Sequence, residues 1–148
     1  FMKINPKIGI DKVIFGMKQN DVTAIYGKPD RDYKDEDENV IFAYNKLKLR
    51  LTFYVEEDFK LGYIVASSPE LELFGNKILN RKITDVKKDL VAKGITKFTQ
   101  EEFDTFENYF NEENWFIFQT EFDEVVKFEI GAIINQKDEF DWKFPAKK

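Results

Sequence analysis

The strongest constraint on the fold is an order of predicted elements that occurs twice along the chain. Residues 20–27 and 84–94 each begin with an N-cap residue, Asn20 or Thr84, carry an apolar stripe and reach a glycine, which predicts two short helices. Each helix is followed by a polar stretch and then by runs in which apolar residues alternate with polar ones, as in half-buried strands. This recurrence indicates an internal duplication.

The alternating runs predict antiparallel strands. Residues 47–54 alternate Leu or Phe with polar side chains, and residues 61–65 alternate again after an acidic turn, which predicts a β-hairpin. Residues 116–134 repeat this arrangement around a predicted tight turn at Asp123 and Glu124. Residues 30–39, in contrast, are charge-rich and are expected to form a loop.

We therefore expect an α+β fold in which two helix–β-meander units form an antiparallel sheet packed by short helices. Residues 2–148 are predicted to be a single domain, with a first repeat at 8–74, a second repeat at 75–135 and a C-terminal tail at 136–148. The tail alternates aromatic and charged residues. It is either a last strand or a segment held against the body by its rings.

The composition excludes several kinds of chemistry. The chain has no cysteine and no histidine, and its only serines are Ser67 and Ser68. Thiol nucleophiles, disulfides, Cys or His metal ligands and the Ser-His-Asp triad are therefore absent. The acidic clusters at 35–38 and 56–58 lack EF-hand spacing, so we expect solvated turns and no metal site. We expect no enzyme and no cofactor; a pair of carboxylates in a cleft is the catalytic arrangement left open.

Charge is distributed unevenly in the predicted second repeat. Residues 77–97 carry seven basic and two acidic side chains, whereas residues 98–126 carry nine acidic side chains, nine aromatic residues and no Lys or Arg. Acidic groups beside exposed rings suit a basic protein partner, because the charges steer the encounter and the rings anchor the complex. The candidate partner-binding residues are Glu101, Glu102, Asp104, Glu107, Glu112, Glu113 and Trp115.

The rings of this stretch allow two interpretations. Alternation favours core positions for five of them, with the acids as the solvated face: Phe106, Phe110, Phe116, Phe118 and Phe122. Trp115 and Ile117 alternate with these rings and are expected on the opposite face of the sheet. There they are either covered by other elements or form an exposed apolar patch of the kind that binds partners.

Residues 16–29 carry a motif in which a glycine and a short polar link precede an Asp-Val helix that ends in Gly-x-Pro. This motif resembles that of the BamE/SmpA-type lipoproteins and of the similar β-lactamase inhibitor protein, which joins two related α+β units. The resemblance implies a scaffold that binds proteins with a sheet face. The chain lacks the lipobox cysteine of the lipoproteins and the disulfides of the inhibitor, and no functional residue is carried over.

In its small size, its net charge of −5 and its many Lys, Asn and Phe residues, the chain also resembles bacterial toxin-immunity proteins. We predict a non-catalytic protein-binding module, most concretely an immunity protein that neutralises a cognate basic toxin by occlusion. The alternative is a small-molecule or lipid carrier with a Phe- and Tyr-lined pocket.

The same features bear on location and on other partners. The negative charge disfavours nucleic acid, although residues 77–97 are basic. No apolar run is long enough to span a membrane, so no membrane partner is expected. Met2 is expected to be the natural start, without a signal peptide, which predicts a cytoplasmic protein. The oligomeric state is left open.

Overall fold

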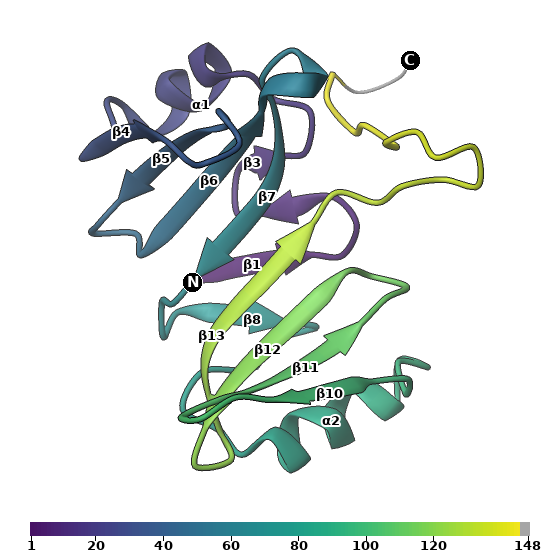
Figure 1. The fold of residues 1–148 in the computed structure, drawn as a ribbon. Coiled ribbons are helices and arrows are strands. Elements are labelled where there is room, and N and C mark those ends of the chain that lie inside the picture. Colours follow the sequence, from purple (N-terminus) through teal and green to yellow (C-terminus); the bar gives the residue numbers. More distant parts are fainter. Residues whose placement is uncertain (146–148) are drawn as a thin grey trace.

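The fold is built around one large antiparallel β-sheet. The structure is a computed structural model and describes residues 1–145. Eight strands form the large sheet in the order β10-β11-β12-β13-β7-β6-β5-β4 (Figure 1). Their bounds are β4 (Arg31–Lys34), β5 (Val40–Tyr44), β6 (Leu49–Tyr54), β7 (Lys60–Ala66), β10 (Thr99–Glu102), β11 (Glu107–Asn111), β12 (Phe116–Glu121) and β13 (Glu124–Gly131).

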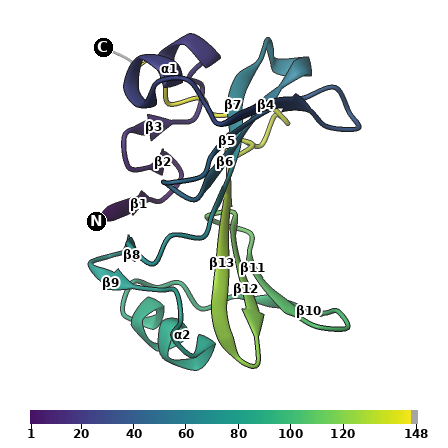
Figure 2. The same ribbon diagram turned by 90° about the vertical axis from the view of Figure 1, so that its left-hand side faces the viewer.

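A smaller sheet and two helices lie on one side of the large sheet (Figure 2). The smaller sheet has five strands in the order β3-β2-β1-β8-β9, with β1 and β8 parallel. Its strands are β1 (Met2–Asn5), β2 (Gly9–Ile10), β3 (Val13–Ile14), β8 (Leu71–Leu73) and β9 (Asn76–Lys77). The helices are α1 (Gln19–Tyr26) and α2 (Ile83–Val91), and a short 3₁₀ turn, η1 (Val55–Glu57), connects β6 to β7.

The large sheet consists of two halves that meet at its centre. Helix α1 precedes β4–β7, which we call the first half, and α2 precedes β10–β13, the second half. Strands β7 and β13 pair antiparallel, with Ile130 opposite Ile64 and Phe128 opposite Ala66. The two halves therefore share one continuous ladder of backbone hydrogen bonds.

The core lies between the large sheet and the elements that cover it, and it is filled largely by rings. Phe53 in the first half and Phe116, Phe118 and Phe128 in the second are fully buried. The last three contact one another, with ring centroids 5.2–6.1 Å apart in tilted or edge-on arrangements. Such contacts add stabilisation beyond the burial of area. The alternate residues of β6, β12 and β13 thus supply the inner face.

The predicted α+β fold class is wrong, because the fold is β-rich. Thirteen strands form the two sheets, whereas the helices are only eight and nine residues long. The prediction of two helix–β-meander units missed strands without alternating hydrophobicity. Strand β4 lies within the predicted charged loop, and all four residues of β10 are exposed. Edge strands that bury neither face leave no hydrophobic period in the sequence. The prediction also missed the separate smaller sheet.

Both helices begin earlier than predicted. Lys18 and Lys82 occupy the N-cap positions in place of Asn20 and Thr84. In α1 the carboxylate of Asp21 accepts a hydrogen bond from the backbone N–H of Lys18 at 2.9 Å, which supports the first turn. Gly27 ends this helix as predicted, with a φ of 80° that glycine adopts without steric cost.

The chain after β13 returns to the first half and is pinned there. The backbone N–H groups of Lys143 and Phe144 both donate to the Phe15 carbonyl at 3.1 Å. The predicted tail is therefore a segment held against the body as far as residue 145, and residues 146–148 lie outside the described part of the chain. Neither helix of the described chain has the length and apolar character needed to cross a membrane.

Candidate functional site

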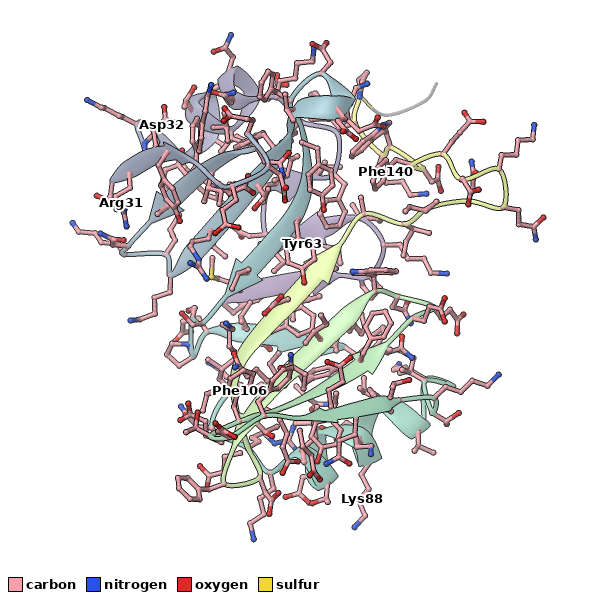
Figure 3. All side chains as sticks on the ribbon, viewed as in Figure 1. Arg31, Asp32, Tyr63, Lys88, Phe106 and Phe140 are labelled. Atoms are coloured by element: carbon pink, nitrogen blue, oxygen red, sulfur yellow. The ribbon has the colours of Figure 1, made fainter. Side chains whose placement is uncertain are left out.

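One corner of the second half gathers acidic and aromatic side chains. The β10–β11 and β12–β13 turns meet at this corner, at the lower left of Figure 1, and border a surface hollow of about 520 Å³. Figure 3 labels Phe106 there. We call this surface the acidic tip and define it by Phe103, Asp104, Phe106, Glu107, Glu121, Phe122 and Asp123.

Phe122 is the most exposed ring of the acidic tip, at 99%. Together with Asp123 it connects Glu121 to Glu124, which are paired across β12 and β13. The φ angles of Phe122 and Asp123 are 50° and 66°. Tight hairpin turns need this left-handed backbone and favour Asn and Gly in it. For phenylalanine the conformation costs about 1–2 kcal/mol, and a ring that is almost fully exposed gains no packing in return.

Two further rings lie beside Phe122. Phe103 and Phe106 stack with their centroids 4.6 Å apart and their planes 18° from parallel. The backbone N–H of Phe103 donates to the Phe106 carbonyl at 2.9 Å, which closes the β10–β11 turn and fixes the pair. Phe103 remains 46% exposed. The tip therefore presents apolar surface that is already ordered before any partner binds.

The charge of the acidic tip is unbalanced. Four of its residues are carboxylates, and within the described part of the chain no Lys or Arg borders the hollow. Among residues 1–145, Asp104, Glu121 and Asp123 take part in no ion pair. Arg81 is held by Asp89 at 2.7 Å. The exposed Lys82, which forms a β-bridge with Glu124 beside the turn, is the cation of this pair that lies next to the tip. The tip thus offers a negative potential that a cationic surface can neutralise.

Glu107 is the one carboxylate of the tip that is held in place. Its Oε2 accepts hydrogen bonds from Gln100 Nε2 at 2.7 Å and from the Tyr109 hydroxyl at 3.0 Å. Burial, followed by the hydrogen bond to Glu107, raises the pKa of Tyr109 to about 12. Tyr109 therefore stays neutral and acts as a donor that orients Glu107 toward the inner side of the sheet.

The structure brings together only some of the predicted partner-binding residues. Asp104 and Glu107 belong to the acidic tip, and Glu102 lies next to it, paired with Glu107 across β10 and β11. Glu101 neighbours Glu102 on β10 and points to the opposite face. Glu112, Glu113 and Trp115 lie in and after the β11–β12 turn, at the other end of these strands.

Sequence reasoning missed Phe103, Glu121, Phe122 and Asp123 as members of this surface. Phe122 was expected in the core because it continues the alternation of Phe116 and Phe118, and this expectation is wrong. The turn is centred on Phe122 and Asp123, one residue earlier than predicted, so Phe122 leaves the strand. Phe116 and Phe118 are fully buried as expected, whereas Phe106 and Phe110 are half-buried.

Trp115 and Ile117 are half-buried and form no exposed apolar patch. The Trp115 ring lies against Phe110 in an edge-on contact, with centroids 4.9 Å apart. It also covers Gly131, where an added Cβ would stand 2.4 Å from Trp115 Cδ1. The prediction that these residues face away from Phe116 and Phe118 agrees with the register, which pairs Ile117 with Glu129 and Phe118 with Phe128.

Comparison with known proteins gives a likeness of fold alone. No protein-family model and no curated protein sequence matches this chain. A crystal structure of an extracellular protein containing a SCP domain, from Bacillus anthracis str. Ames, is similar with a TM-score of 0.51 and 15% sequence identity. The similarity covers 79% of this chain but only 43% of that chain. The resemblance to BamE/SmpA-type lipoproteins and the one to immunity proteins stay predictions.

Proposed function

We propose that this protein is a non-catalytic protein-binding module that binds a basic partner protein through the acidic tip. The observation that supports this proposal is Phe122, an almost fully exposed ring in a strained turn between unpaired carboxylates. Residues that cost folding stability without a structural return are typical of sites kept for function.

The proposed complex follows the usual anatomy of a protein interface. Aromatic anchors at the centre contribute most of the binding free energy when they are desolvated, and charged residues around them govern association rate and specificity. Phe122 and the stacked pair Phe103–Phe106 supply the anchors, and Asp104, Glu121 and Asp123 supply the charges. A basic surface gains from both, whereas an anionic lipid surface or nucleic acid is repelled.

Its most concrete form is an immunity protein that occludes a cognate basic toxin. Neutralisation by occlusion requires an exposed docking surface and no catalytic group, and the acidic tip has this character. We also propose that the chain acts in the cytoplasm, where a toxin made by the same cell has to be blocked. The structurally similar protein from Bacillus anthracis is described as extracellular, so cell fractionation is a direct test of this location.

The decisive experiment measures binding to the product of the gene adjacent to the one that encodes this chain. Calorimetry at low salt is expected to detect a complex, and Phe122→Asn is expected to weaken it at least about 30-fold, as loss of an interface anchor does. Added salt is expected to weaken it further by screening the charges.

Phe74→Asn is the matched control for Phe122→Asn. Phe74 also lies at positive φ, 52°, in a tight hairpin turn, but in the smaller sheet and 5.3 Å from the ammonium of Lys93. Its replacement is expected to leave affinity unchanged. Absence of a complex at low salt contradicts the immunity role. A complex that is equally weakened by both variants contradicts the assignment to the acidic tip.

A further inference from the structure

A second hollow lies on the opposite face of the large sheet from the helices, where the two halves meet. Its volume is about 500 Å³, within the range of small-molecule sites, about 300–1,000 Å³. Four rings line it, and we call it the aromatic pocket: Tyr54 at the end of β6, Tyr63 on β7, Trp115 before β12 and Phe140 on the C-terminal segment. Figure 3 labels Tyr63 near the centre of the large sheet and Phe140 above and to the right of it.

Two of these rings lie flat on glycine backbone. An added Cβ at Gly62 would stand 2.1 Å from Tyr54 Cε2, and one at Gly131 would stand 2.4 Å from Trp115 Cδ1. Each ring therefore packs one face against a strand that has no side chain at that position. Both rings also line the pocket.

Neighbouring side chains fix the positions of the rings. Phe140 contacts Tyr54 with centroids 5.7 Å apart, and Trp115 contacts Phe110 at 4.9 Å. The Tyr63 hydroxyl donates to Glu129 Oε1 at 2.5 Å. Burial and this hydrogen bond raise the pKa of Tyr63, so its ring carries no charge. A pocket whose walls are ordered in advance loses little entropy when a ligand enters.

The rim of the aromatic pocket is acidic. Asp37, Glu56 and Glu57 line it, and no Lys or Arg among residues 1–145 does. Within residues 1–145 these three carboxylates form no ion pair. A pocket of this kind concentrates negative potential over ring faces whose quadrupoles are also negative.

We propose that the aromatic pocket binds an organic cation with an alkylammonium or quaternary ammonium group. Ring faces attract such a cation, each by about 0.5–2 kcal/mol depending on desolvation, and carboxylates at the rim neutralise its charge. Neutral ligands gain only the apolar contact, and anions are repelled. This site is separate from the acidic tip: the two lie at opposite ends of β12, about 20 Å apart by the rise of a six-residue strand.

The first test uses choline and its neutral isostere 3,3-dimethylbutan-1-ol. In a Trp142→Phe background, fluorescence of Trp115 reports the pocket, and calorimetry gives affinity. Choline is expected to bind saturably and at least about ten-fold more tightly than the isostere. Equal affinities, or no saturable binding of any cation tested, overturn the proposal.

Two variants separate the ring contribution from that of the rim. Trp115→Leu removes the ring face and is expected to weaken choline binding about ten-fold or more, and Glu57→Gln is expected to weaken it several-fold at low salt without changing shape. Phe74→Asn, remote from the pocket, is the control and is expected to bind choline normally. If Trp115→Leu unfolds the chain, Glu57→Gln and Glu56→Gln together still decide the question.

A further comparison identifies the source of the cation. Three probes carry related cationic groups. Spermidine is a small polyamine with alkylammonium groups, choline is a small molecule with a quaternary ammonium group, and an oligolysine peptide carries ammonium groups on its side chains. Tighter binding of choline or spermidine assigns a small molecule, and tighter binding of the peptide assigns a lysine of a protein. Either result supports an organic-cation pocket, and failure of all three contradicts it. The adjacent-gene product plays no part in these measurements. Because the acidic tip also attracts basic peptides, only peptide binding that is lost in Trp115→Leu and kept in Phe122→Asn is assigned to the aromatic pocket.

Discussion

The two halves of the large sheet share a scaffold and differ in charge. Each has four antiparallel strands after a short helix, and each buries phenylalanine on the inner face. On its outer face the first half carries most of a basic hollow of about 360 Å³, which is lined by Arg31, Lys48 and Arg50 and also by Lys127 of β13. The second half carries the acidic tip instead. Packing dictates the inner residues of both halves, whereas the exposed positions are free to diverge.

The two hairpin turns show the same contrast at the level of single residues. Phe59, in the β6–β7 connection, has a φ of 57° and packs against the core. Phe122, in the β12–β13 turn, has a φ of 50° and is 99% exposed. The same strained conformation is thus offset by burial in the first half and left without compensation in the second. This difference is the reason why we assign the proposed binding role to Phe122 and not to Phe59.

The largest expected effect tests whether the halves fold as one unit. Phe53→Ala and Phe118→Ala each remove a fully buried ring, one from each half, and each is expected to cost about 3–5 kcal/mol. Because β7 and β13 pair along the centre, both variants are expected to shift one shared unfolding transition. Urea denaturation monitored by fluorescence measures this.

Single-tryptophan variants resolve the halves in that experiment. Trp115 reports on the second half, and Trp142 packs near Gly16 and Lys60 and reports on the first. Coincident transitions from both reporters are expected. Separate transitions, with Phe118→Ala shifting only the Trp115 signal, would contradict the prediction that the two halves unfold as one cooperative unit.

A smaller effect is expected at the glycines beneath the rings of each half. Gly62→Ala forces the ring of Tyr54 to move and Gly131→Ala forces that of Trp115 to move, since the added Cβ would stand 2.1 Å and 2.4 Å away. Each is expected to destabilise by about 1–3 kcal/mol. Thermal unfolding measures the cost, and Gly75→Ala, with no atom in the way but a φ of 83°, separates steric from backbone strain.

The pH dependence compares buried tyrosines of the two halves. Burial raises the pKa of Tyr54 to about 12, and burial with the Glu107 hydrogen bond raises that of Tyr109 to about 12, from an ordinary value of 10.0. The folded state therefore holds these protons more tightly than the unfolded state does. Their contribution is present in full below pH 10 and is lost as the pH rises from 10 to 12.

Stability measured by urea denaturation is expected to fall over that alkaline window. Tyr54→Phe removes one of the titrating groups and is expected to make the fall shallower. An unchanged slope in Tyr54→Phe contradicts a contribution of Tyr54 to this pH dependence. Absorbance of tyrosinate provides an independent readout of the same titration.

The smallest effect has opposite signs in the two hairpin turns. Phe122→Asn relieves backbone strain and loses no packing, so it is expected to stabilise by about 0.5–1 kcal/mol. Phe59→Asn relieves the same strain but removes a ring from the core, and is expected to destabilise. Thermal unfolding of both variants compares them directly. If Phe122→Asn instead lowers the free energy of unfolding, Phe122 does not destabilise the fold, and the argument that it is kept for binding fails.

Sequence patterns predicted the parts of the fold that bury one face and failed elsewhere. The hairpin of β6 and β7 follows from perfect alternation at residues 47–54. Strands β4 and β10 are held only by pairing at one edge, and their mostly exposed residues have no hydrophobic period. These two strands form because a neighbouring strand pairs with them, and a local sequence pattern carries no information about that pairing.

The candidate surfaces show the same division. The acidic stretch at residues 98–126 could be identified from the sequence, because counting charged residues does not require knowledge of the fold. Phe122 was hidden because a shift of the turn by one residue moves a side chain from the core to solvent. The aromatic pocket draws rings from positions 54, 63, 115 and 140, and only the pairing of β7 with β13 and the return of the C-terminal segment unite them.

The anchoring of the C-terminal segment on Phe15 has a consequence for the chain during its synthesis. Residues 140–144 are synthesised after all the strands of the large sheet, yet Lys143 and Phe144 make the hydrogen bonds to Phe15, and Phe140 supplies a wall of the aromatic pocket. A nascent chain that already contains all eight strands of the large sheet still lacks this closure. The closure at Phe15 and the wall of the aromatic pocket therefore form only after translation has passed residue 144, and removal of residues 140–144 is expected to affect the N-terminal end of the molecule.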